Sequence, residues 1–382
     1  MNFLTGTNGQ LHCKSILIIT LSAISLIAST PNIGFSDWTW VSGSNIINQP
    51  GVYGTKGVAD PLNIPGARDA SISWIDGGGS LWLFGGAGYD SIGSFDLLND
   101  LWKFDGTSWT WISGSNIKDQ WGVYGTKGVA NPANIPGARH RIISWTDGGG
   151  NLWLFGGGGY DSTGGRSYLN DLWKFDGTSW TWVSGSSIIN QAGVYGTKGE
   201  ASSDNVPGAR YRSISWTDGS GSLWLFGGRG YDSTNWMGRL NDLWKFDGTN
   251  WTWVSGSNTV NHAGVYGTKG EADPANVPGT RGLSVSWIDG SGNLWLFGGS
   301  GFDSTGSGGY LNDLWKFEGF PSCHPADTNC DNVISILDIL GYIDQWAVGD
   351  VTILEVLEGI DLWAAGSYYW DPSDGKFKPG EP

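Results

Sequence analysis

The chain repeats itself at a fixed spacing, and this period constrains its fold more than any other feature. A PGAR or PGTR motif begins 71 residues after the previous one, at Pro65, Pro136, Pro207 and Pro278. The tryptophans of an LWKF motif keep the same spacing, at Trp102, Trp173, Trp244 and Trp315. A constant period is typical of stacked arrays, solenoids and propellers, in which each unit buries its apolar surface against its neighbours.

Each repeat contains four short runs that predict β-strands. In the first repeat they are Ser71–Trp74, Leu81–Phe84, Leu101–Phe104 and Trp109–Trp111. The first two runs surround an Asp-Gly cluster at Asp76–Gly79, and the last two surround Asp105–Thr107, so each pair predicts a β-hairpin. Four short antiparallel strands in a repeat make a blade, and blades arranged radially make a propeller.

The order of motifs in the repeat resembles a kelch blade, as found in galactose oxidase-like kelch proteins. The motifs are Arg68, a strand that ends in Gly85-Gly86, the segment LNDLWKFD, and a WTW strand. The resemblance extends over residues 37–320 and is repeated four times. It implies an all-β propeller of four kelch-type blades.

The two ends of the array predict that the ring closes. Asp37–Trp40 matches a fourth strand without three strands before it, whereas Arg281–Phe317 provides three strands without a WTW segment after them. We therefore expect the N-terminal strand to complete the last blade, which would remove exposed sheet edges. A ring of two chains and an open arc are the alternatives.

Most of the tryptophans fit a structural role. Five positions recur in all four repeats, as the series of Trp38, Trp40, Trp74, Trp82 and Trp102, and account for 20 of the 25 tryptophans. Large flat side chains at fixed places suit packing between blades. Trp121 and Trp236 lie in the repeats but outside this pattern, and we expect both in loops.

Strand direction predicts which loops share a face. The turns at Asp76–Gly79 and Asp105–Thr107 lie at one end of the blade, whereas the loops Ala87–Asp96 and Ser42–Pro65 lie at the other. Long connections on a rigid scaffold are common binding sites. The alternative for Ser42–Pro65, which is nearly identical in all repeats, is an extra hairpin that thickens the blade.

The repeats diverge at the start of the inner strand and after the glycine pair, on the loop-rich face. A ligand site there and neutral drift are equally compatible with this divergence. The candidate ligand-binding residues are Asp69, Trp121, His140, Arg141, Tyr211, Arg212, Arg229 and Trp236.

The sequence argues against catalysis in the propeller without excluding it. Galactose oxidase carries a copper site near its propeller axis, but residues 37–320 contain no cysteine, so a copper site with a cysteine-linked tyrosine cannot form there. No nucleophile motif is present either. The net charge of −15 disfavours nucleic acid and anionic lipid as partners and suits cations and neutral ligands.

The N-terminal region, residues 1–36, resembles a secretory signal. Lys14 precedes an apolar run from Ser15 to Ala28 that is short for a membrane span. We expect a secreted or cell-surface protein, and an uncleaved anchor is the alternative.

Residues 321–382 differ in character from the repeats and resemble a dockerin module. Oxygen ligands follow the spacing of a Ca²⁺-binding loop that leads into a helix, at Asp327, Asn329, Asp331, Val333 (through its carbonyl), Ser335 and Asp338. A second copy of the helix follows, but Asp344, Trp346 and Val348 stand where ligands would be needed. We therefore expect one Ca²⁺ site. The departure also puts recognition of a cohesin-like partner in doubt.

Two further features belong to this module. Cys323 and Cys330 flank the entry to the loop, and in an exported protein a disulfide is the favoured interpretation. The tail from Tyr368 to Phe377 predicts a hairpin packed on the helices.

Two functions remain open from the sequence. The first is an exported, non-catalytic binding protein that presents a carbohydrate or protein ligand site on its loop-rich face and attaches through its Ca²⁺ module. The alternative is a secreted enzyme that degrades or modifies polysaccharides and carries a dockerin-like tag.

Overall fold

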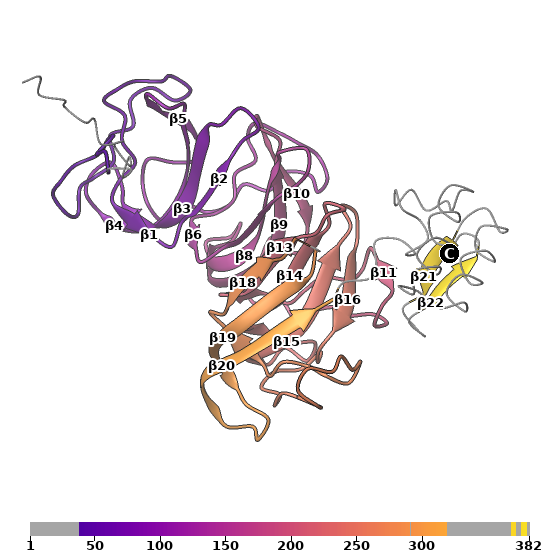
Figure 1. The fold of residues 1–382 in the computed structure, drawn as a ribbon. Coiled ribbons are helices and arrows are strands. Elements are labelled where there is room, and N and C mark those ends of the chain that lie inside the picture. Colours follow the sequence, from indigo (N-terminus) through magenta and orange to yellow (C-terminus); the bar gives the residue numbers. More distant parts are fainter. Residues whose placement is uncertain (1–37, 291, 319–367, 372–375, 380–382) are drawn as a thin grey trace, which may run out of the picture. The chain divides into compact units, whose positions relative to one another are not determined.

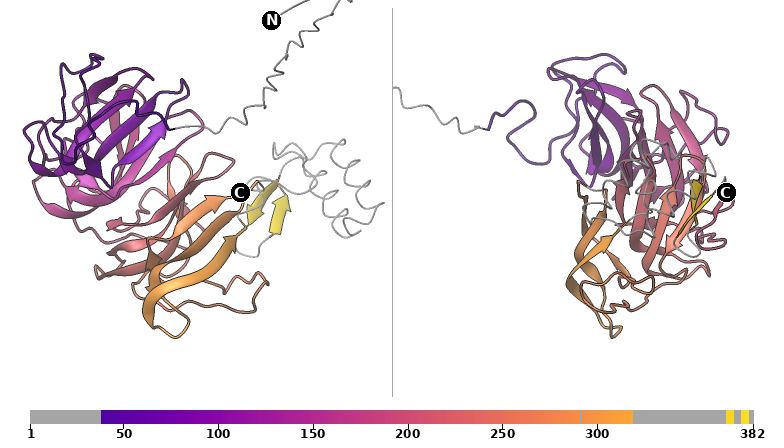
Figure 2. Two further views of the ribbon diagram at one scale, coloured as in Figure 1. Left: turned by 60° about the vertical axis from the view of Figure 1, so that its left-hand side comes forward. Right: turned by 45° about the vertical axis from the view of Figure 1, so that its right-hand side comes forward.

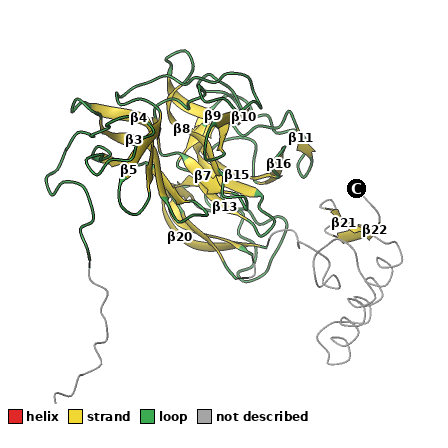
Figure 3. Ribbon diagram, turned by 90° about the horizontal axis from the view of Figure 1, so that it is seen from above, coloured by secondary structure: helices red, strands yellow, loops and turns green. Residues whose placement is uncertain are grey.

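The computed structural model describes residues 38–290, 292–318, 368–371 and 376–379. Every regular element in these ranges is a β-strand (Figure 3). Residues 1–42 and 43–382 form two separate compact units. No helix in the described ranges is long and apolar enough to cross a membrane. The expected signal, the Ca²⁺ ligands and the two cysteines lie outside the described residues.

Each of the four repeats forms one antiparallel sheet, which we call a blade (Figure 1). Blade 1 contains β1 (Arg68–Asp69), β2 (Ile72–Ile75), β3 (Leu81–Tyr89), β4 (Phe95–Phe104) and β5 (Trp109–Ser113). Blade 2 contains β6 (Arg139–His140), β7 (Ile143–Thr146), β8 (Leu152–Tyr160), β9 (Arg166–Phe175) and β10 (Trp180–Ser184). The all-β class and the four sheets agree with the prediction from the repeats.

The remaining strands belong to two more blades and a hairpin. Blade 3 contains β11 (Ala201–Ser202), β12 (Arg210–Tyr211), β13 (Ile214–Thr217), β14 (Leu223–Tyr231), β15 (Met237–Phe246) and β16 (Trp251–Ser255). Blade 4 contains β17 (Arg281–Gly282), β18 (Val285–Ile288), β19 (Leu294–Phe302) and β20 (Gly308–Phe317). The tail forms the predicted hairpin of β21 (Tyr368–Asp371) and β22 (Lys376–Pro379).

Strand order within a blade follows chain order. In blade 1, β3 pairs with β1 and β2 on one side and with β4 on the other, and β4 then pairs with β5. The two middle strands are longer than predicted. β3 continues past the glycine pair at Gly85-Gly86, and β4 begins earlier because it pairs with this extension. The expected loop at Ala87–Asp96 is instead a tight turn, in which the Asp90 N–H donates to the Ser94 carbonyl at 3.0 Å.

The PGAR and LND motifs meet in a buried polar network. Arg68 donates two hydrogen bonds to the Asp100 carboxylate, at 2.6 and 2.7 Å. The Tyr53 hydroxyl and the Trp102 indole N–H donate to the same carboxylate, at 2.6 and 2.7 Å. Asp100 is fully buried, and a buried carboxylate requires such partners. Equivalent bonds recur in the other blades, at Asp171, Asp242 and Asp313.

Aromatic side chains join successive blades. Trp82 packs on Phe175 of blade 2, and Trp153 packs on Phe246 of blade 3, with ring centroids 5.4 Å apart in both pairs. Trp224 packs on Phe317 of blade 4 at 5.5 Å. The same junction therefore forms three times. Figure 2 shows the sheets from two further sides.

The long segment before each blade has a structural role. Val52 and Ile64 form a β-bridge, so the segment folds into a small hairpin. The Gly57 N–H donates to the Trp111 carbonyl at 2.8 Å, and the Lys56 ammonium lies 4.3 Å from the centroid of the Trp111 ring. The segment thus thickens the blade against its outer strand, as the alternative interpretation of Ser42–Pro65 predicted.

The closing strand predicted at residues 37–40 is not among the strands of the described residues. Residues 38–40 adopt no strand conformation, and Trp38 and Trp40 are exposed. In the described residues β20 pairs only with β19, so blade 4 lacks an outer strand.

Candidate functional site

Four positions in each blade form a set that we call the variable row. In blade 1 the strand register pairs Asp69 with Ala87, and Ala87 with Leu97, while Ala70 follows Asp69. Cross-strand partners project on the same face of a sheet. The corresponding sets are His140, Arg141, Gly158 and Tyr168 in blade 2, Tyr211, Arg212, Arg229 and Arg239 in blade 3, and Gly282, Leu283, Ser300 and Tyr310 in blade 4.

The row continues from blade to blade. The Tyr168 ring of blade 2 stacks on Tyr211 of blade 3, with centroids 4.6 Å apart and an interplanar angle of 17°. Arg239 of blade 3 donates to the Ser300 hydroxyl of blade 4 at 2.9 Å. The rows of blades 2, 3 and 4 therefore belong to one strip rather than to three independent sites.

The second position of the row has an unusual backbone. The φ angles of Ala70, Arg141, Arg212 and Leu283 are 51°, 51°, 60° and 61°. Positive φ is uncommon for residues other than glycine, and such residues cluster at functional sites. The Arg141 N–H donates to the Ala70 carbonyl of the previous blade at 3.0 Å, so this conformation also connects neighbouring blades.

The arginines divide into two groups. Four of the nine are committed to the buried network, at Arg68, Arg139, Arg210 and Arg281. The other five lie in or beside the rows of blades 2 and 3, at Arg141, Arg166, Arg212, Arg229 and Arg239. Among the described residues only Arg166 of these five forms an ion pair, with Asp96 at 2.7 Å. The rows of blades 2 and 3 therefore carry uncompensated positive charge.

Blade 3 contributes most of this charge. Arg212 lies over the Tyr211 ring, 5.0 Å from its centroid, and its buried Nε has no hydrogen-bond partner in the described part of the chain. Arg229 is exposed and is the register partner of both Tyr211 and Arg239. Like charges on directly opposed positions repel each other, so a bound anion would relieve the pair.

His140 lies in the same electrostatic environment. Burial lowers the pKa of the His140 imidazole, and the positive charges of Arg141 and Arg166 lower that pKa further. Asp69 of blade 1 opposes this effect. His140 is consequently neutral near pH 7 and can accept or donate a hydrogen bond without adding charge.

The structure brings together six of the eight predicted ligand-binding residues. Asp69, His140, Arg141, Tyr211, Arg212 and Arg229 all belong to the variable row. Tyr211 is buried beneath Arg212 and against Tyr168, so its ring is not available to stack on a sugar.

The other two predicted residues lie in loops, Trp121 in the connection before the Val123–Ile135 bridge and Trp236 at the turn before β15. Trp121 packs against Gly164 in the turn of blade 2, and Trp236 follows the corresponding turn of blade 3. Their side chains are 57% and 72% exposed, so both rings remain accessible. They belong to the end of the blade that bears the variable row.

Sequence reasoning missed three residues of the site, Tyr168, Arg166 and Arg239. All three lie at or near the start of the second long strand of a blade, β9 in blade 2 and β15 in blade 3. The equivalent strand of blade 1, β4, was expected to begin at Leu101 but begins at Phe95. The sequence does carry a signal for this position, because four residues spaced 71 apart differ in size and charge: Leu97, Tyr168, Arg239 and Tyr310.

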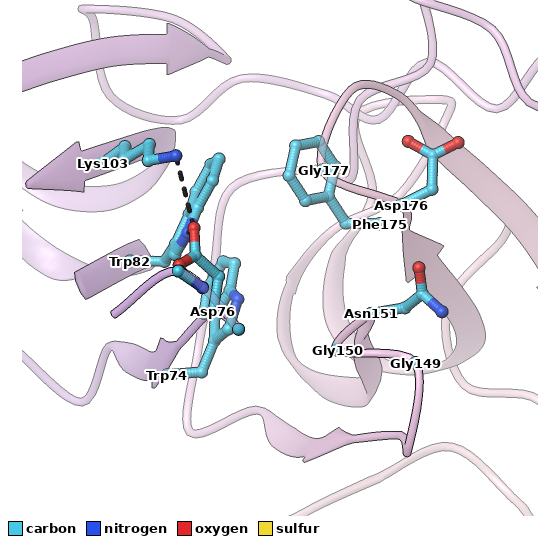
Figure 4. Close-up of a pocket in the computed structure, with 12 residues that line it drawn as sticks. Trp74, Asp76, Trp82, Lys103, Gly149, Gly150, Asn151, Phe175, Asp176 and Gly177 are labelled. Carbon is cyan, nitrogen blue, oxygen red and sulfur yellow. Dashed lines mark hydrogen bonds and ion pairs between the residues drawn. The ribbon is translucent and has the colours of Figure 1, made fainter. Parts of the chain in front are cut away.

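A cleft of about 310 Å³ lies at the opposite end, between the turns of blades 1 and 2 (Figure 4). Trp74, Trp82, Phe175 and Asp76 contribute to its lining. The Trp82 indole donates to Asp76 at 2.9 Å, and Lys103 pairs with Asp76 at 3.3 Å. These residues recur in the other blades, so the cleft is a feature of the blade junction.

The described residues contain no group of three or more His, Cys, Asp or Glu side chains that could hold a metal ion. The predicted Ca²⁺ ligands are not among those residues.

Similarity to known proteins is low. No protein-family model matches the chain, and no curated protein sequence matches it. A structure of YjhT is 16% identical over 66% of this chain and 82% of its own, with a TM-score of 0.32. A protein of unknown function from Dyadobacter fermentans is 10% identical over 71% of this chain and 66% of its own, with a TM-score of 0.36.

A third solved structure is a fungal alcohol oxidase of the AA5 family in complex with copper. It is 13% identical over 66% of this chain and 54% of its own, with a TM-score of 0.30. The strands of the present chain by themselves form four antiparallel sheets of the kind expected for kelch-type propeller blades.

Proposed function

We propose that the chain is an exported binding protein whose variable row, in blades 2 and 3, binds an acidic carbohydrate. The observation that carries this proposal is the position of the arginines. All five that are free of the buried network lie in or beside these two rows, and four of them form no ion pair among the described residues. A cluster of unpaired arginines favours a carboxylate or sulfate ligand, because the guanidinium fork can bind such groups through two parallel hydrogen bonds.

The surroundings of the arginines favour a carbohydrate over a simple ion. Trp121 and Trp236 present exposed rings at the same end of the blades, and exposed aromatic rings can pack on the apolar face of a sugar. The buried Arg212 Nε is a donor without an acceptor in the described residues, and leaving such a donor unpaired costs about 1–3 kcal/mol. A ligand oxygen would satisfy it.

The charge of the whole chain limits the kind of anion. The net charge of −15 would repel a long polyanion such as nucleic acid. A short acidic glycan is affected mainly by nearby charges, because salt screens charges beyond about 8 Å at physiological ionic strength. A small acidic ligand, rather than the neutral one suggested by the net charge, therefore suits the variable row.

The ends of the chain extend this proposal to location and attachment. The apolar N-terminal region would direct export, and residues 321–382 would form a dockerin-like attachment module with one bound Ca²⁺. Calcium titration of the full chain by calorimetry should give one equivalent, and Asp331→Ala should abolish it. Asp344→Ala, in the second copy of the helix, is the matched control and should leave the titration unchanged. Two equivalents, or none, would contradict this assignment.

A glycan array probed with the full chain tests the ligand class. We expect signals on glycans that carry carboxylate or sulfate groups, little signal on their neutral counterparts, and a decline as salt rises. Arg229→Ala should weaken these signals several-fold without changing the melting temperature, because Arg229 is exposed. Equal binding to acidic and neutral members of a pair would rule out the proposal.

A further inference from the structure

Blade 4 lacks partners that the outer strand supplies in the other three blades. The N–H groups of Gly57, Gly128 and Gly199 each donate to a tryptophan carbonyl of the outer strand at 2.8 Å. The lysines before these glycines lie over the rings of the same tryptophans, at 4.3–4.4 Å. In the described part of the chain, Gly270 and Lys269 of blade 4 have neither contact.

Asn276 shows the same deficiency. The amides of Asn63, Asn134 and Asn205 each donate twice. One of the two bonds goes to the carbonyl of the first tryptophan of the outer strand, which is Trp109, Trp180 or Trp251. Asn276 donates only to the Glu271 carbonyl, at 3.1 Å, among the described residues. Blade 4 therefore presents an edge prepared for a strand of the WTW type.

A segment of the required type is present near the N-terminus. The Trp40 indole donates to the Ser42 carbonyl at 2.9 Å, as the Trp111 indole donates to the Ser113 carbonyl at 2.9 Å. Gly43 has a φ of 87° and Asn48 a φ of 59°, close to the 78° of Gly114 and the 61° of Asp119. The segment thus has the local conformation that follows an outer strand, although Trp38 is fully exposed.

The end blades also expose the two halves of a blade junction. Blade 4 leaves Trp287 and Phe297 43% and 42% exposed, whereas the corresponding Trp145 and Phe155 of blade 2 are 4% and 0% exposed. On the opposite side of the array, Leu81 of blade 1 is 43% exposed. Its counterparts Leu152, Leu223 and Leu294, which lie at junctions, are 1–3% exposed. The two end faces therefore have the chemistry of a junction that the chain forms three times internally.

The path of the chain identifies which blade must lie beside residues 38–42. Between Ser113 and Gly122 the chain passes directly from the outer strand of blade 1 to blade 2, where the Gly122 N–H donates to the Asp161 carbonyl at 3.0 Å. Ser42 and Gly51 are separated by the same number of residues, and Gly51 is bound to blade 1 through the Asp90 carbonyl. A blade that accepts residues 38–42 must therefore lie next to blade 1.

Within one chain, blade 4 is not that neighbour, because both end faces are exposed. We propose that the neighbour is blade 4 of a second copy. Two copies associate reciprocally, and residues 38–42 of each supply the missing outer strand of the other. The end faces of blades 1 and 4 pack together in both junctions. This two-fold arrangement leaves no unpaired blade edge.

A pair of cysteines tests the exchange. Lys103 is the register partner of Thr110, so the repeat places Thr39 opposite Lys316. Opposed strand positions lie within the Cα separation that a disulfide spans. The full chain with Thr39→Cys and Lys316→Cys, oxidised and run without reductant, should migrate as a covalent dimer. Light scattering should give the mass of two chains for the wild type.

Two controls accompany the pair. Thr181→Cys with Lys174→Cys joins register partners inside blade 2 and should form a link within one chain. Thr39→Cys alone reveals any link through the native cysteines. The proposal is overturned if the Thr39–Lys316 link forms within one chain, because the chain then closes on itself. It is also overturned by a ladder of larger covalent species, or by no link where the blade 2 control forms one.

Discussion

At the scale of single residues, the glycine pair shows most clearly why the repeat is constrained. Gly156 has a φ of 62°, and a Cβ there would lie 2.8 Å from the Arg210 carbonyl oxygen of blade 3 and 2.8 Å from the Leu169 carbonyl oxygen of its own blade. Both obstacles are backbone atoms, which cannot move aside cheaply. The glycine therefore allows the close approach of two blades as well as a bulge in the strand.

We expect Gly156→Ala to lower stability by at least about 2 kcal/mol, from positive φ and from the close contact with the next blade. Gly177→Ala is the control, because Gly177 also has positive φ, at 92°, but a Cβ there would meet nothing within 4 Å. Its cost should be about 1–2 kcal/mol, from φ alone. Thermal unfolding followed by tryptophan fluorescence compares the two variants, and equal losses would exclude the role given to the blade contact.

At the scale of elements, the sequence predicts the strands better than their lengths. Alternation located four of the five strands of blade 1, and the recurring tryptophans of blades 1–3 are mostly buried as expected. The lengths of the middle strands were underestimated, because a glycine pair usually ends a strand, whereas here it forms a bulge within one. Arg68 and Asp100 are 32 residues apart, and no local pattern predicts that they pair.

The candidate site was predicted in part for the same reason. Divergence between repeats located Asp69, His140 and Tyr211, but their cross-strand partners depend on register. Tyr168 and Arg239 belong to the site because the bulge aligns their strand with the preceding one. Register across a bulge is set by tertiary structure, so it could not be derived from spacing alone.

At the scale of the whole molecule, the repeat correctly predicted four blades, and the predicted closing strand is not among the strands of the described residues. A repeat array requires caps or closure at its ends, because each end exposes a surface that internal units bury. Trp287 and Leu81 are such exposed end residues here. The sequence of the WTW segment indicates what it can pair with but does not identify which copy provides the edge.

The variable row is the central claim, and one set of substitutions tests it with residues that the scaffold already accepts. Arg212→Ala, Arg229→Ala and Arg239→Leu give blade 3 the residues that blade 1 carries at the same positions, Ala70, Ala87 and Leu97. The control also removes three positive charges, but at the opposite end of the blades, through Lys103→Ala, Lys174→Ala and Lys245→Ala.

The decisive measurement is the binding of acidic glycans on an array by the wild type and these two triple variants. We predict at least a tenfold loss of signal for the arginine variant, little change for the lysine variant, and folding of both shown by their melting curves. Equal signals from the arginine variant and the wild type, or an equal loss in both variants, would contradict the assignment of ligand binding to the variable row.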